Sequence, residues 1–153
     1  MKNFLASLLL LTGLMTATAC KKSDNNGPVP VMQTLLGTFS GSQQVPAVTS
    51  SATGTITGSY DKTAMVLTYT VTFSGLSPTI AHLHLGAPGA KGDVFYPFPF
   101  NNATKDGFVS PITGSTRVLL PAESTALLNR GVYANLHSTM YPGGEIRADM
   151  TVY

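Results

Sequence analysis

Beyond residue 30, apolar and polar residues alternate with a period of two over many short runs. The clearest run extends from Met65 to Phe73, where every second residue is apolar and the residues between them are mostly threonine. Successive side chains of a strand point to opposite faces of its sheet. This run therefore predicts a strand with one face in the core and a threonine face toward water.

Similar runs are separated by turn signals at intervals of about ten residues, as expected of a sandwich or barrel of antiparallel strands. The polar segment Tyr60–Thr63 predicts a hairpin connection between two of them. We predict an all-β fold, an antiparallel, Greek-key-like β-sandwich with one short helix. The predicted strands lie at about 34–40, 52–60, 64–73, 79–85, 92–96, 114–120, 131–138 and 144–152.

One segment, at about 121–129, has the signals of a helix. Pro121 suits a first helical turn, Glu123 suits the positive N-terminal end, and Gly131 follows the C-terminal end, where a left-handed residue is common. The aromatic run Phe95–Phe100 contains two prolines, which confine it to a sheet edge or an irregular stretch. Its rings either cover the end of the core or form an exposed binding patch.

The first 19 residues predict a secretory signal. They contain one lysine, an apolar run from Phe4 to Met15 that is too short to cross a bilayer, and small residues before Cys20. The segment Ala17–Cys20 resembles the lipobox of bacterial lipoproteins, although no large aliphatic residue stands three places before the cysteine. We expect Cys20, the single cysteine, to be lipidated and to anchor the protein to a membrane of the bacterial cell envelope. The outer membrane is the favoured location.

Residues 20–30 are rich in Lys, Ser, Asn, Gly and Pro and predict a flexible tether, so the folded domain should span 31–153. The whole chain carries a formal charge of +2, but six basic and six acidic residues cancel from Pro28 onward. The domain therefore has no excess of positive charge for binding nucleic acid. Its expected partners are the lipid membrane, through Cys20, and a protein or glycan ligand.

Three blocks of sequence resemble the CHRD domain, a repeat described in the animal protein chordin and found in bacterial exported proteins. They are Gly41–Pro46 with Thr53–Thr55, Leu76–His84, and Val132–Ser138 running into Tyr141–Arg147. The resemblance covers roughly residues 34–152. It departs from the family pattern at Gln44, Leu85 and Ala148. It implies an immunoglobulin-like or superoxide-dismutase-like sandwich, and it implies little about activity.

All three histidines lie inside these blocks. His82 and His84 are two apart in a predicted strand, so both imidazoles should project from one face. Together with His137 from a neighbouring strand they could bind one Zn²⁺ or Cu²⁺, with Glu145 or Asp93 completing the site. Alternatively, the histidines hydrogen-bond loop carbonyls and hold the turns at 86–93 and 141–145 in place.

Glu145, Arg147 and Asp149 alternate with apolar residues and predict a polar face over a core face. A carboxylate partner for Arg147 would be structural. The sequence contains no G-x-S-x-G elbow, glycine-rich phosphate loop or H-E-x-x-H motif. The first hypothesis is therefore a noncatalytic binding or adhesion module on the cell envelope, and the alternative is a histidine-based Cu or Zn protein, including a small redox enzyme.

Overall fold

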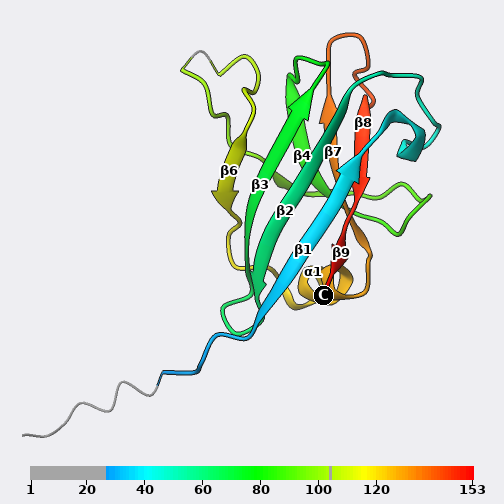
Figure 1. Cartoon of the computed structure of the whole chain (residues 1–153). Coiled ribbons are helices and arrows are strands. Elements are labelled where there is room, and N and C mark those ends of the chain that lie inside the picture. The colour runs from blue at the N-terminus through cyan, green and yellow to red at the C-terminus, as the bar shows by residue number, and fades with distance from the viewer. Residues whose placement is uncertain (1–26, 104) are drawn as a thin grey trace, which may run out of the picture.

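The computed structural model describes residues 27–103 and 105–153, and these form two antiparallel sheets packed face to face (Figure 1). The all-β sandwich with one short α-helix, predicted from the alternating pattern, is confirmed. The predicted signal and Cys20 lie outside the described residues. No helix in the described part of the chain is long and apolar enough to cross a membrane.

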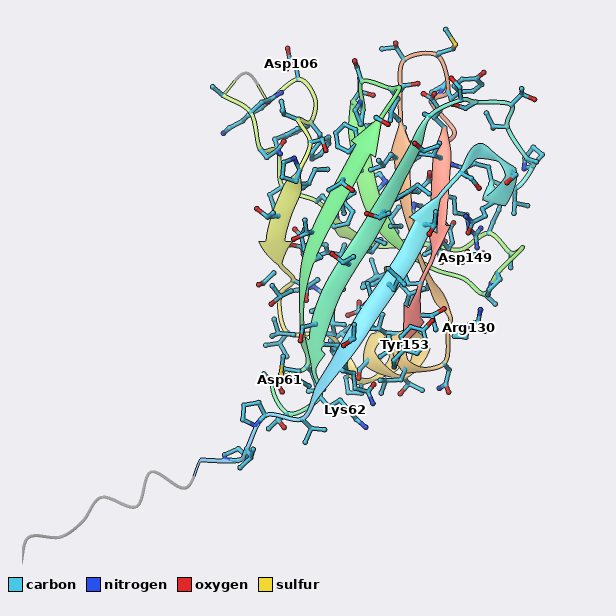
Figure 2. All side chains as sticks on the ribbon, viewed as in Figure 1. Asp61, Lys62, Asp106, Arg130, Asp149 and Tyr153 are labelled. Atoms are coloured by element: carbon cyan, nitrogen blue, oxygen red, sulfur yellow. The ribbon has the colours of Figure 1, made fainter. Side chains whose placement is uncertain are left out.

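The first sheet has five strands in the order β6-β3-β2-β1-β9. Its central strands β1 (Met32–Phe39), β2 (Thr53–Asp61) and β3 (Val66–Ser74) form a meander. β6 (Ile112–Ser115) and β9 (Thr151–Val152) pair at the two edges. The predicted β2–β3 hairpin turn is present, and the Asp61 carboxylate holds it by accepting hydrogen bonds from the Thr63 and Ala64 amides. Asp61 and Lys62 mark this end of the sandwich in Figure 2.

The second sheet has four strands in the order β5-β4-β7-β8. β4 (Ile80–Leu85) and β7 (Val132–His137) are central, with β5 (Val94–Pro97) and β8 (Ile146–Asp149) at the edges. A short 3-10 helix, η1 (Gly41–Gln43), follows β1 and lies against β8. This second sheet carries all three histidines.

The core lies between the two sheets and is formed by the apolar residues that alternate with polar ones along the strands. In β3, Leu67, Tyr69 and Val71 are buried while Thr68 and Thr72 are exposed, as the pattern predicts. The facing sheet contributes the corresponding residues of β4, β7 and β8, which are Ala81, Leu83, Val132, Ala134, Leu136, Ile146 and Ala148.

The helix α1 (Pro121–Leu128) begins where the sequence predicts and lies at the end of the sandwich near Tyr153 (Figures 1 and 2). Glu123 accepts a hydrogen bond from the Leu120 amide and two from Arg117, and the Arg117 bonds hold the pKa of this carboxyl below its usual range. The left-handed residue after the helix is Arg130, with φ of 59°, and not Gly131 as the sequence suggests.

Two predicted strands differ from the structure. The run 144–152 divides into β8 and β9, which belong to different sheets, because the chain crosses the core edge at Met150, whose side chain is buried. The strand predicted at 114–120 ends at Ser115. The alternation is broken there because the Thr116 side chain turns inward and its hydroxyl accepts a hydrogen bond from the Leu67 amide.

The aromatic run 95–100 mainly covers the core. Phe98 is buried against Tyr69 with ring centroids 4.7 Å apart, and Phe95 and Tyr96 pack on the same cluster. β5, which contains part of the run, is an edge strand, as two closely spaced prolines require. Phe100 is more exposed and stacks on Phe108.

Candidate metal centre

The outward face of the second sheet is polar, yet it is buried. Tyr133, Asn135 and His137 alternate with the core residues of β7 and are all shielded from water, and Arg147 on β8 is only 1% exposed. The 86–93 loop covers part of this face, because Arg147 donates hydrogen bonds to the carbonyls of Ala87 and Ala90. Alternation correctly predicts that these residues face away from the core, but it does not predict their burial.

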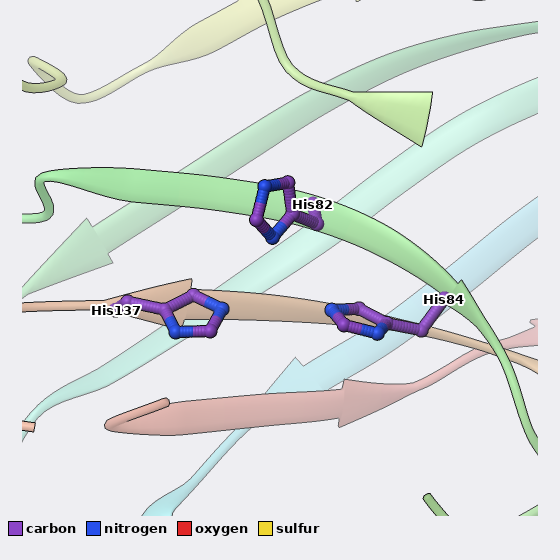
Figure 3. Close-up of side chains that lie close together, drawn as sticks. All are labelled: His82, His84 and His137. Carbon is purple, nitrogen blue, oxygen red and sulfur yellow. The ribbon is translucent and has the colours of Figure 1, made fainter. Parts of the chain in front are cut away.

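The three imidazoles meet on this covered face. His82 and His84 extend from β4, and His137 extends from the neighbouring strand β7 (Figure 3). One ring nitrogen from each residue lies within 4.8 Å of the corresponding nitrogens of the other two. His84 and His137 are 8% exposed, and His82 is intermediate. The geometry therefore places three imidazole nitrogens around one point.

Backbone carbonyls fix the orientation of two of the rings. His84 Nδ1 lies 3.0 Å from the Gly92 carbonyl oxygen, and His137 Nδ1 lies 2.9 Å from that of Pro142. A carbonyl only accepts, so each Nδ1 must donate its hydrogen, and each Nε2 is left with a free lone pair. These contacts are the loop tethers that the alternative interpretation of the histidines predicts, but they use only one nitrogen of each ring.

The remaining nitrogens are buried and have no hydrogen-bond partner among the described residues. They are His82 Nδ1, His84 Nε2 and His137 Nε2. A buried polar atom without a partner costs about 1–3 kcal/mol. Three such atoms facing one another favour a site that a ligand completes.

Burial also favours the neutral form of two of the imidazoles, those of His82 and His84. It lowers the pKa of His82 to about 4, with a smaller contribution from the charges that His137 and His84 would carry. Burial lowers the pKa of His84 too, and this outweighs the opposing effect of its hydrogen bond to Gly92. Metal ions bind imidazole only without its second proton. At neutral pH these two residues can therefore act as ligands without first losing a proton.

Tyr133, which sequence reasoning missed, supports the site. The Tyr133 ring stacks on His84 with centroids 4.7 Å apart and planes 7° from parallel. On the same ring lies the Arg147 guanidinium, 3.5 Å from the centroid. The signal that could have identified Tyr133 and Asn135 is their alternation with His137 on the same strand.

The predicted acidic residues occupy other positions. The Glu145 carboxylate accepts hydrogen bonds from Ser50 and Ser138, and Asp93 is exposed. Among the described residues, the cluster of converging donor atoms contains only the three histidines, so neither acid belongs to it. Arg147 pairs with Asp149 at 2.7 Å, which matches a structural ion pair.

The two antiparallel sheets and the single short α-helix of the described residues place the chain in the class of small all-β domains. A sequence model of the CHRD domain family matches residues 36–150, so the chain belongs to the CHRD domain family, which suggests a binding-type module. No curated protein and no solved structure matches the chain.

Proposed function

We propose that this CHRD domain is a metal-binding module that holds one Zn²⁺ or Cu²⁺ ion on His82, His84 and His137. The observation that carries the proposal is the convergence of three buried ring nitrogens, within 4.8 Å of one another and without hydrogen-bond partners. Imidazole is a good ligand for both ions. The donor set matches metal sites in which three protein nitrogens leave a fourth position open.

The surrounding contacts match those that ligating histidines usually make. Such residues commonly donate their other ring N–H to a carbonyl or carboxylate, which fixes the ring and raises the basicity of the ligating nitrogen. His84 and His137 make this contact to Gly92 and Pro142. Bound at about 2.0–2.1 Å, tetrahedral nitrogens lie roughly 3.3 Å apart. Because the ring nitrogens lie within 4.8 Å of one another, metal binding would require the rings to move inward by at most about an ångström.

The test is elemental analysis of the purified domain, followed by titration of the chelator-treated protein with Zn²⁺ and Cu²⁺. We expect one ion per chain and a higher melting temperature, because the ion binds the folded state only. His82→Ala is the most informative variant, since the His82 imidazole has no hydrogen-bond partner in the described part of the chain and its loss should leave the fold intact. This substitution should abolish the metal-dependent rise in melting temperature.

His84→Ala and His137→Ala separate the two interpretations of the histidines. Each removes a ligand and also a loop tether, so each should both abolish metal binding and lower the stability of the metal-free protein by about 1–3 kcal/mol. If neither ion shifts the melting temperature of the wild type, the metal proposal is wrong. The domain would then be the metal-free binding or adhesion module that the sequence favours.

We further propose that the domain is displayed on the bacterial cell envelope by a lipid on Cys20. The support is the apolar leader before Cys20 and the polar tether after it. Cys20→Ser should leave an uncleaved or soluble protein, because the thiol is the attachment point of the lipid. Fractionation of cells into membrane and soluble pools tests this. Undiminished membrane association of a correctly cleaved Cys20→Ser protein would contradict the anchor.

A further inference from the structure

A small cavity of about 170 Å³ adjoins the histidine cluster. His84 and His137 form part of its wall, so two of the three imidazoles border it. Its other lining residues include Gln44, Lys91 and Asn135. A ligand in this cavity could therefore reach an ion held by the three imidazoles.

The charged side chains that line this cavity are both cationic, Lys91 and Arg147. Asn135 accepts a hydrogen bond from Gln44 through Oδ1, which leaves its amide nitrogen as a donor with no partner among the described residues. Lys91 is exposed and makes no hydrogen bond or ion pair in the described ranges. No acidic residue lines the cavity. This lining fits a small anion and disfavours a cation.

The charge of the proposed centre leads to the same conclusion. Three neutral imidazoles around a divalent ion leave two positive charges partly buried, and a buried charge is costly unless it is paired. The Asp149 carboxylate already pairs with Arg147, whose guanidinium also donates to Ala87 and Ala90. No carboxylate joins the ligand cluster among the described residues. The centre therefore needs an anion from solution.

We propose that the open coordination position takes a small anion, a simple carboxylate or bicarbonate, which binds the metal from this cavity with Asn135 and Lys91 as its other contacts. The inference rests on the proposed metal centre and names the ligand class of that site. Lys91 supplies attraction at the water-exposed rim, and the Asn135 amide supplies a directed hydrogen bond. The negative charge of an anion bound there would offset part of the positive charge of the metal ion and of Lys91.

The experiment uses the Cu²⁺-loaded domain in a buffer free of coordinating anions, with azide as the spectroscopic probe. Azide should produce a new charge-transfer absorption, and formate or bicarbonate should displace it. The anion that displaces azide at the lower concentration shows whether the site prefers a carboxylate or bicarbonate. Lys91→Met should weaken azide binding about three- to fivefold, as expected for one cation near a solvent-exposed rim. Metal content should be unchanged, since Lys91 is not a ligand.

Lys62→Met is the matched control, because it removes the same charge at the β2–β3 hairpin, away from Asp149 (Figure 2), whose ion-pair partner Arg147 lines the cavity. It should leave azide affinity unchanged. A wild-type domain that binds copper but shows no azide absorption would overturn the anion inference and leave the metal proposal standing. Equal azide affinity in both lysine variants would overturn the placement of the anion in this cavity. Failure to bind copper or zinc would instead overturn the proposed function itself.

Discussion

The outward faces of the two sheets both consist of polar residues that alternate with core residues along the strands, but the two faces differ in their exposure to water. On the first sheet, hydroxyl side chains form cross-strand pairs in water, such as Thr55 with Thr72 at 2.8 Å and Thr68 with Ser115 at 3.1 Å. On the second sheet, the residues at equivalent positions, His84, Asn135 and Arg147, are buried. One face is solvated and the other is covered.

The difference arises from loops that fold over the second sheet, most of them remote in the sequence from the strands that they cover. The 86–93 loop accepts hydrogen bonds from Arg147, the Gln44 side chain bonds Asn135, and the turn after β7 is held by His137 through Pro142. A polar side chain that is shielded from water must find partners or a ligand. The threonine face satisfies this requirement with solvent, whereas the covered face satisfies it with loops and, by our proposal, with a metal ion.

The largest predicted effect is on the covered face. Arg147→Met should lower the free energy of unfolding of the metal-free domain by about 3 kcal/mol, because it leaves the partly exposed Asp149 carboxylate and two loop carbonyls without their buried donor. Chemical denaturation in the presence of chelator measures it. A loss below about 1 kcal/mol would mean that the covering loop is only loosely held, and the contrast between the two faces would fail.

Acid should destabilise the metal-free domain through the histidines. The folded state holds the pKa of His82 near 4, below its ordinary value of 6.5, so the neutral form is favoured in the folded protein. The contribution to stability is thus complete above pH 6.5 and is lost as the pH falls toward 4. Between pH 7 and pH 5 we expect a loss of about 2 kcal/mol.

The matched measurement for this prediction is the same pH series on His82→Leu, which should lose less stability. Glu123, whose pKa is lowered by Arg117, loses its contribution only below the ordinary carboxyl range near 4.5, outside this window. A flat profile between pH 7 and pH 5 in the wild type would show that the imidazoles are better solvated than the structure indicates.

The sequence predicts the first face better than the second, and the reason is physical. Strand positions and side-chain faces follow from local alternation, so the Leu67, Tyr69 and Val71 core face and the Thr68 and Thr72 water face are both confirmed. The convergence of His82 and His84 also follows from spacing. The loops that cover Arg147 leave no signal in its own strand, because the covering groups are backbone carbonyls more than 50 residues away in the chain.

A third prediction concerns the turn before β8. Gly144 has φ of 115°, and a Cβ there would lie 2.6 Å from the Asn135 side chain, so Gly144→Ala should cost about 2 kcal/mol and displace Asn135, which lines the cavity. Gly143→Ala is the matched control, because its Cβ would meet nothing within 4 Å. Thermal unfolding of both variants tests the contrast. Equal stability of the two would contradict the close packing of this turn over the second sheet.

The smallest predicted effect is on the open face. Thr55→Val and Thr72→Val keep the branched shape that suits a strand and remove a hydroxyl pair that water already solvates. Each should change the free energy of unfolding by no more than about 0.5 kcal/mol, the usual range for surface substitutions. The double variant should match the sum of the singles, since a replaced pair leaves no unsatisfied partner. Denaturation curves of the four proteins measure the coupling. A coupling above about 1 kcal/mol would show that the threonine pairs contribute like buried contacts, and the two faces would then differ less than their exposure indicates.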